Sequence, residues 1–227
     1  MKYKNLHPWD ISTKEGIKVQ KMLKNKLIFN EGKFSIEKIC GTDVSYDKSK
    51  NMLFSAVIIL KYPEMKIIEE QTAIMKSTFP YVPGLLSFRE VPVLLKAFDR
   101  IENIPDVVMC DGHGIAHPRG IGLASHLGLI IDLPTIGCAK KRLFGKYSEI
   151  GNIKGDYSYI SDSNKNIGIV LRTRANVKPV FVSQGYKIGI NFSREIILNC
   201  CKKYRIPEPI RKAHKTVNIV RKNFIKS

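Results

Sequence analysis

The order of predicted strands and helices constrains the fold of this chain more than any other feature. Three β-rich stretches come first, at residues 39–46, 52–60 and 67–76, and short polar connections separate them. Such short connections predict an antiparallel meander. Apolar residues at helical spacing then predict a helix over 85–101, which Pro92 should kink or divide. A short buried strand follows and ends at Asp111.

The second half of the chain predicts a mixed sheet. Small and apolar residues favour a helix over 120–130, and a strand follows over 134–139. The succession of strand, helix and strand implies parallel pairing. The remaining predicted elements are an N-terminal helix over 12–27, a hairpin over 166–174 and 180–187, and helices over 193–204 and 207–224. This order predicts an α/β chain of the ribonuclease-H-like class, in which helices flank a mixed central β-sheet.

Composition indicates the kind of partner. The chain has 227 residues, 44% of them hydrophobic, which suits one domain spanning residues 1–227. It carries 38 Lys and Arg against 20 Asp and Glu, a formal charge of +18 that exceeds what solubility requires. A polyanionic partner explains this excess, and a lysine-rich proteome is the alternative. The lysines are spread along the chain, which favours a broad basic face over a basic tail.

The sequence predicts a soluble, intracellular, cytoplasmic protein without membrane contact. No stretch approaches the roughly 18 uninterrupted apolar residues of a membrane span. The five cysteines are odd in number and include no Cys-x-x-Cys pair. We therefore expect reduced, buried thiols.

Two aspartates predict a metal site. Asp43 lies inside the first β stretch among apolar neighbours, where a carboxylate is costly unless it is paired or metal-bound. In the predicted topology the first and fourth strands are neighbours, so Asp43 and Asp111 can meet near the middle of the sheet. Two close carboxylates repel unless a cation lies between them, and oxygen ligands suit Mg²⁺ or Mn²⁺. Either aspartate could instead be a cap or turn residue.

The loop after Asp111 is rich in glycine, histidine and arginine. His113 and His117 have the spacing of zinc ligands on a helix, but the intervening glycines and Pro118 disfavour a helix and hence a zinc site. The glycines also do not complete the dinucleotide-binding fingerprint. We expect them to let the backbone approach a ligand, with exposed amides as donors. His117 and Arg119 then contact phosphate or the surroundings of the metal, or they hold the loop.

Residues 79–84 form a rigid, proline-clamped turn that presents Tyr81. Such a turn is often only a connection. In a basic protein, however, a stiffly mounted aromatic side chain can fill the space that an extruded nucleotide leaves in a base stack. Glu90 follows on the next segment, and taken alone it reads as a solvated surface residue.

Five ordered motifs together resemble the endonuclease V family, the deoxyinosine 3′-endonucleases of DNA repair. The resemblance runs from about residue 10 to about residue 220. The motifs are the strand around Asp43, the turn over 80–84 with residues 88–90, and the segments 111–119, 137–141 and 207–214.

The resemblance implies five catalytic residues. Asp43 and Asp111 match the metal-binding carboxylates of the family, and Glu90 matches the third acidic member of the site. His214 is the histidine that the last helix brings to the site. Lys140 matches the active-site lysine, which stabilises charge at the scissile phosphate or orients the attacking water. The implied cofactor is Mg²⁺, with Mn²⁺ as a substitute.

The resemblance also implies how the substrate binds. Tyr81 matches the wedge of the family's Pro-Tyr-Ile-Pro turn, which ends here at Pro83 and has Val82 in place of isoleucine. A flipped hypoxanthine would be read largely by main chain near Gly84, Leu86, Gly112 and Leu123. The cut would fall at the second phosphodiester bond 3′ to the lesion and leave a 3′-hydroxyl and a 5′-phosphate. The implied partner is DNA containing deoxyinosine, bound by a monomer.

The residues alone support only a metal-dependent phosphodiesterase acting on nucleic acid. One alternative is another nuclease of the same fold, such as a ribonuclease or a resolvase, against which Tyr81 and His214 argue. A non-catalytic basic binding module would lack an essential carboxylate or the lysine, and all are present. An inosine-specific endoribonuclease stays open, because a contact to a 2′-hydroxyl cannot be read from sequence.

Overall fold

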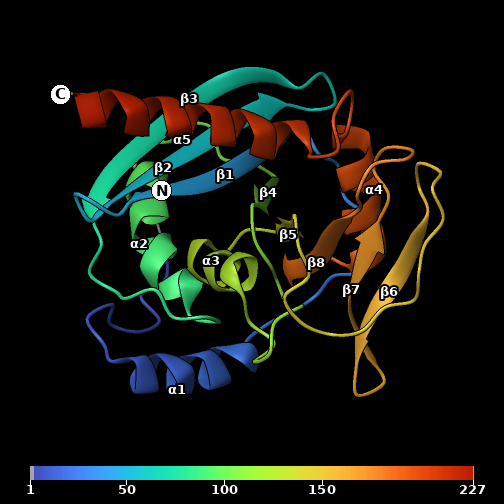
Figure 1. The fold of residues 1–227 in the computed structure, drawn as a ribbon, viewed down its shortest axis with the longest axis horizontal. Coiled ribbons are helices and arrows are strands. Elements are labelled where there is room, and N and C mark those ends of the chain that lie inside the picture. Colours follow the sequence, from blue (N-terminus) through green and yellow to red (C-terminus); the bar gives the residue numbers. More distant parts are fainter. Residues whose placement is uncertain (1–2, 227) are drawn as a thin grey trace.

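A computed structural model describes residues 3–226, which form one eight-stranded sheet with helices on both faces (Figure 1). The helices are α1 (Thr13–Lys24), α2 (Leu86–Phe98), α3 (Leu123–Ile131), α4 (Ile190–Cys200) and α5 (Glu208–Lys226). The strands are β1 (Lys38–Asp47), β2 (Met52–Lys61), β3 (Lys66–Lys76), β4 (Val107–Cys110), β5 (Thr135–Ala139), β6 (Tyr157–Asp162), β7 (Lys165–Leu171) and β8 (Val180–Tyr186).

The sheet is mixed, with the strand order β3-β2-β1-β4-β5-β8-β7-β6. β1, β4 and β5 run parallel at its centre. β2 and β3 extend one side as an antiparallel meander, and β8, β7 and β6 extend the other side as antiparallel strands. The predicted α/β fold with a mixed central sheet is therefore confirmed.

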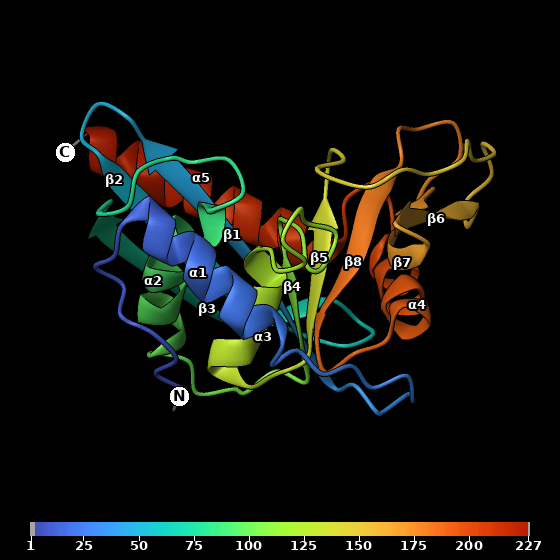
Figure 2. The ribbon, with the colours of Figure 1, turned by 90° about the horizontal axis from the view of Figure 1, so that it is seen from below.

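Side chains alternate between two cores because successive residues of a strand point to opposite faces. On one face, apolar residues of β1, β2 and β4 pack against α4 and α5. On the other face, their neighbours in the strands pack against α2 and α3. Figures 1 and 2 show α5 on one side of the sheet, with α2 and α3 on the other and α1 outside them. The molecule thus has a helical layer on each side of the sheet.

α5 sits unusually close to β1 at Gly41. A Cβ atom on Gly41 would overlap the carbonyl group of Pro209 and lie 2.8 Å from the backbone nitrogen of Ile210. Ile210 is fully buried, so the first turn of α5 rests directly on the strand. This contact fixes where the rest of α5 lies relative to Asp43, two residues further along β1.

The structure differs from the predicted secondary structure in two details. α2 runs through Pro92 as one helix, so the predicted alternative of a division at the proline is wrong; the residues around the proline are buried against the sheet and hold the helix together. Strand β6 was not predicted. It pairs antiparallel with β7 at the edge of the sheet, where its side chains are mostly partly or fully exposed and the apolar signal is weak.

Two expectations from composition can also be compared with the structure. All five cysteines are buried and free, as expected. Within residues 3–226, no helix combines the length and the apolar character needed to cross a bilayer.

Candidate active site

Asp43 and Asp111 meet because β1 and β4 are parallel neighbours. Thr42 lies opposite Cys110 in the register of this pair, so the next residue on each strand is one of the two aspartates. The backbone N–H of Asp111 donates to the carbonyl oxygen of Thr42 at 3.3 Å. Ligand atoms of Asp43, Asp111 and His214 all lie within 4.8 Å of one another. The predicted meeting of the two aspartates is confirmed.

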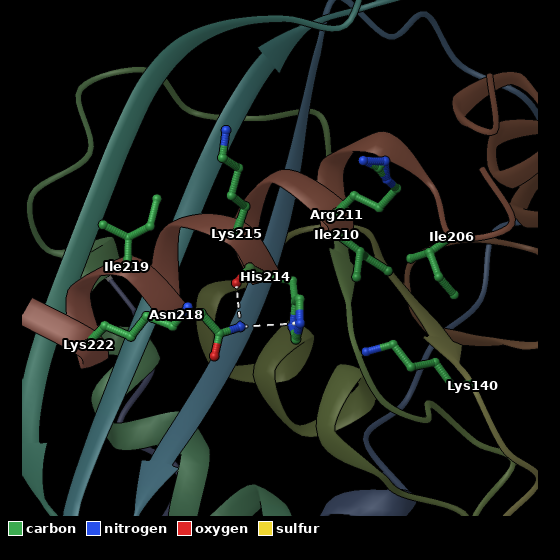
Figure 3. A pocket seen from close by; sticks show the side chains of 9 residues that line it. All are labelled: Lys140, Ile206, Ile210, Arg211, His214, Lys215, Asn218, Ile219 and Lys222. Carbon is green, nitrogen blue, oxygen red and sulfur yellow. Dashed lines mark hydrogen bonds between the residues drawn. The ribbon is translucent and has the colours of Figure 1, made fainter. Parts of the chain in front are cut away.

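α5, which packs on one face of the sheet, brings His214 to these carboxylates. The Nδ1 atom of His214 lies 2.7 Å from Oδ2 of Asp43. One turn further, the side-chain nitrogen of Asn218 lies 3.2 Å from Nε2 of His214 and 2.7 Å from its carbonyl oxygen. Because an amide nitrogen only donates, Nε2 accepts and Nδ1–H donates to Asp43. Asn218 therefore fixes the tautomer and the orientation of His214 (Figure 3).

Lys140 follows directly after β5 and forms an ion pair with Asp111. The Lys140 side chain is 44% exposed, whereas the Asp111 side chain is only 15% exposed. The geometry leaves the lysine accessible to a substrate while it stays anchored on the carboxylate. Lys140 thus stands beside the pair of aspartates, as the family resemblance implied.

Glu90 comes from α2, on the opposite face of the sheet from α5. It lines a cavity of about 290 Å³ together with Asp43, Asp111, Lys140 and His214. Burial, together with the charges of Asp43 and Asp111, raises the pKa of Glu90 to about 8. Burial and Asp111 also raise the pKa of Asp43. Three acidic side chains in one small cavity favour a bound cation, and this all-oxygen carboxylate set fits Mg²⁺ or Mn²⁺.

The Glu90→Gln variant of the metal-free protein should be more stable than the wild type at pH 8 but not at pH 5. The pKa of Glu90 rises from 4.5 to about 8 on folding, so the folded protein keeps a proton that the unfolded chain releases. Its contribution to stability is complete below about pH 4.5 and is lost as the pH rises through 8. We expect a difference of about 4 kcal/mol at pH 8, measured by urea unfolding with chelator.

Glu102→Gln is the matched control, because Glu102 is exposed. It should leave the pH profile of stability unchanged. Added Mg²⁺ should stabilise the wild type more than Glu90→Gln at pH 8, since it favours the ionised carboxylate. A stability difference between Glu90→Gln and wild type that does not change with pH would contradict this account.

A second cavity of about 270 Å³ lies beside this centre, on the α2 and α3 side of the sheet. This volume suits one planar base, because it lies just below the range of about 300–1,000 Å³ that is typical of small-molecule sites. Its lining includes seven of the predicted substrate-binding residues: Tyr81, Pro83, Gly84, Leu86, Gly112, His117 and Leu123. Tyr81 is 69% exposed at the rim. We call this cavity the base-sized pocket.

His117 and Arg119 hold the wall of the base-sized pocket. Nε2 of His117 lies 3.0 Å from the carbonyl oxygen of Gly84, and Nη2 of Arg119 donates to the same oxygen at 2.6 Å. Gln20 of α1 adds a third donor at 2.9 Å. Gly84 itself has φ +78°, a conformation that glycine adopts readily. Of the two open readings of His117 and Arg119, the structure favours the one in which they hold the loop.

The role expected for the loop glycines needs correction. A Cβ atom on Gly114 would overlap the backbone carbonyl of Gln184 in β8, and the Gly114 N–H donates to Oγ of Ser183 at 2.8 Å. This glycine therefore allows two backbone segments to pack together, and its amide is not free for a ligand. Gly112 does line the base-sized pocket, where a Cβ atom would press on Leu123.

Three contributors to the site were not predicted. Gln20 and Asn218 act on Gly84 and His214, and neither residue belongs to a catalytic motif, although Asn218 has the i, i+4 spacing from His214. Arg89 is 8% exposed and stacks on the Tyr46 ring at 3.9 Å. Its buried Nε has no hydrogen-bond partner within residues 3–226, and it borders a cavity on the far side of Tyr81.

Known proteins share both the sequence and the fold. A family model described as Endonuclease V matches residues 18–215. The endonuclease V of Thermosipho melanesiensis is 46% identical over 224 residues, covering 99% of this chain and 98% of that protein. The crystal structure of Bacillus subtilis endonuclease V has a TM-score of 0.95 at 29% identity, covering 100% of this chain and 99% of that one.

A further solved structure contains nucleic acid. It is the endonuclease V of Ciona intestinalis in complex with a 23mer DNA containing an inosine followed by a ribo-adenosine. That chain has a TM-score of 0.82 at 30% identity, covering 94% of the present chain and 100% of its own.

Proposed function

The chain belongs to the endonuclease V family, and from this premise we propose that it cuts DNA at deoxyinosine in a metal-dependent reaction. As a member it is an endonuclease, a hydrolase of phosphodiester bonds. The observation that carries the proposal is the base-sized pocket beside a centre of three carboxylates, a lysine and a histidine. The base-sized pocket suits recognition of a single base, and the centre with the carboxylates suits hydrolysis of a nearby phosphodiester.

Asp43 and Asp111 hold the metal, Mg²⁺ or in its place Mn²⁺, with Glu90 as the third acidic residue. When bound there, such an ion would supply Lewis-acid chemistry for the activation of water and for the stabilisation of the leaving oxygen. Lys140, anchored on Asp111, directs its ammonium group to the scissile phosphate and stabilises its developing charge. His214 holds Asp43 in position through Nδ1–H.

Recognition uses the base-sized pocket. The extruded hypoxanthine enters between α2 and α3 and meets main chain near Gly84, Leu86, Gly112 and Leu123. Adenine has an amino donor where hypoxanthine has an oxo acceptor, so a pocket fixed by main chain rejects adenine by leaving groups unpaired. Gly84 is held rigid for this purpose by Gln20, His117 and Arg119.

The separation of pocket and metal centre fits a cut displaced from the lesion. We propose that the bond hydrolysed is the second phosphodiester 3′ to deoxyinosine, leaving a 3′-hydroxyl and a 5′-phosphate. We further propose that residues 1–227 act as one catalytic domain and as a monomer, inside the cell where the DNA is. Arg89, buried without a hydrogen-bond partner in the described chain, contacts a phosphate beside Tyr81.

The Tyr81→Ala variant should lose activity on duplex DNA selectively. Tyr81 fills the gap that the flipped base leaves in the stack, and a single strand has no paired stack to restore. We expect kcat/KM for a deoxyinosine duplex to fall about tenfold, with little change for the single-stranded oligonucleotide. Tyr81→Phe, which keeps the ring, should behave as wild type. Equal losses on both substrates would show that Tyr81 is not a wedge.

The test of the proposed function is strand cleavage of matched, end-labelled substrates. These are duplexes with one deoxyinosine or one deoxyadenosine and a single-stranded RNA with one inosine, each with Mg²⁺ and with chelator. A single metal-dependent nick at the second bond 3′ to deoxyinosine supports the proposal. Cutting confined to the RNA would instead identify an inosine-specific endoribonuclease. Absence of lesion-dependent cutting would overturn the proposal.

A further inference from the structure

A basic groove runs along α5 on the side of the sheet opposite the base-sized pocket (Figure 3). We propose that this groove binds the DNA strand on the 3′ side of the cleaved bond, over three to four nucleotides. The proposal rests on the proposed function and extends the substrate site beyond the pocket and the metal centre. The groove has a volume of about 710 Å³. The residues that line it are Lys140, Ile206, Ile210, Arg211, His214, Lys215, Asn218, Ile219 and Lys222.

The groove is continuous with the metal centre. Lys140, His214 and Asn218 line both cavities. In Figure 3 the side chains of Lys140 and His214 point toward each other at one end of the groove. A strand whose phosphate lies at Lys140 therefore passes directly onto α5.

The two layers of helices place the three cavities in order. The base-sized pocket lies among α1, α2 and α3, and the groove lies on α5 across the sheet. The metal centre takes Glu90 from one layer and His214 from the other, so it lies between them. A strand with its flipped base in the pocket and its scissile bond at the metal continues into the groove. Because the proposed cut is 3′ to the lesion, the groove holds the 3′ arm.

The chemistry of the groove suits a nucleic-acid strand. Its lining contains Lys215 and Lys222 and no carboxylate. Both lysines are exposed, and within residues 3–226 neither side chain has an ion pair or a hydrogen bond. Arg211 is different, since it stacks on the Tyr204 ring at 3.4 Å and lies 3.7 Å from Glu208. The two lysines are therefore free to bind phosphates.

An apolar side chain lies between the two lysines. Ile219 is 47% exposed, although it belongs to a helix whose buried face is formed by other residues, Ile210, Ala213 and Val217. An exposed isoleucine flanked by cations suits the sugar and base of a strand whose phosphates bind the lysines. The eight helical rises from His214 to Lys222 span about 12 Å, which matches three to four nucleotides at about 3.4 Å each.

The experiment compares single-stranded deoxyinosine oligonucleotides whose 3′ arm beyond the cut is shortened from ten nucleotides to one. The KM of the wild type should stay constant while the 3′ arm is shortened to about four nucleotides. It should rise when the arm is shorter than that. The double variant Lys215→Ala/Lys222→Ala should raise KM for the long substrate about tenfold and become insensitive to the 3′ arm. Its salt dependence, log KM against log salt concentration, should flatten by about 1.4 for two lost phosphate contacts.

Lys14→Ala/Lys21→Ala is the matched control, since these exposed lysines are also seven residues apart on a helix. It should keep the wild-type response to the 3′ arm. A second series, shortened on the 5′ side, should respond equally in the groove variant and the wild type. The groove assignment is overturned if the wild-type KM ignores the 3′ arm, or if the groove variant loses its response to the 5′ arm instead. Failure of the wild type to cut any deoxyinosine substrate would overturn the proposed function itself.

Discussion

Replacing Asp111 by asparagine should reduce the rate of strand cleavage at least about a thousandfold. The change keeps the shape of the side chain but removes one of the two charges proposed to bind the metal, and it breaks the ion pair that anchors Lys140. Loss of several kcal/mol of transition-state stabilisation corresponds to this factor, at about 1.4 kcal/mol for each tenfold. The measurement is single-turnover cleavage of the deoxyinosine duplex in saturating Mg²⁺.

Stability separates a catalytic effect from a folding effect in this variant. Asp111 raises the pKa of both Asp43 and Glu90, so its removal relieves repulsion in the metal-free protein. Asp111→Asn should therefore unfold at the same temperature as the wild type or higher, and it should lose the rise in melting temperature that Mg²⁺ causes. Asp10→Asn, which removes the same charge from an exposed position, should change neither activity nor the Mg²⁺ response. Residual cleavage above about one tenth of wild type would show that Asp111 is not essential.

The aspartate pair was predictable because it depends on topology alone. An acidic residue inside an apolar strand, and another at the end of a buried strand, become neighbours once the two strands are parallel and adjacent. Glu90, Lys140 and His214 were assigned only through the family resemblance, since nothing in their local sequence distinguishes them from surface residues. The structure brings all five to one cavity.

What sequence reasoning missed depends on tertiary contacts. Three donors converge on the Gly84 carbonyl from segments up to 64 residues away, and no local pattern encodes such convergence. Gly114 illustrates the opposite error. A glycine-rich loop after a strand suggests a ligand cradle, but here the space around Gly114 is taken by the backbone of β8. Close packing between two backbones and close approach of the backbone to a ligand both require a residue without a Cβ atom. A glycine in the sequence therefore does not distinguish the two cases.

Gly41→Ala should destabilise the protein by about 3 kcal/mol and impair cleavage as well. The new methyl group would overlap the carbonyl of Pro209 at the start of α5, and backbone atoms of a buried helical turn cannot move aside as a flexible side chain can. For a chain of this size the loss lowers the melting temperature by about 10 °C. Because α5 must shift, His214 moves from its 2.7 Å contact with Asp43. A displacement of about 1 Å in an active site can cost about a hundredfold in rate.

Gly16→Ala is the control for Gly41→Ala. It tests whether the expected effect comes from crowding by the new methyl group or from the loss of a glycine as such. Gly16 lies inside α1, where a Cβ atom would make ordinary contact with Phe88 at 3.5 Å. Alanine favours a helix over glycine by about 1 kcal/mol, so this variant should melt at the same temperature as the wild type or a few degrees higher. Cleavage should be unchanged, because α1 does not carry His214. If Gly41→Ala matched Gly16→Ala in melting temperature and in cleavage, the close seat of α5 on β1 would not be what positions His214.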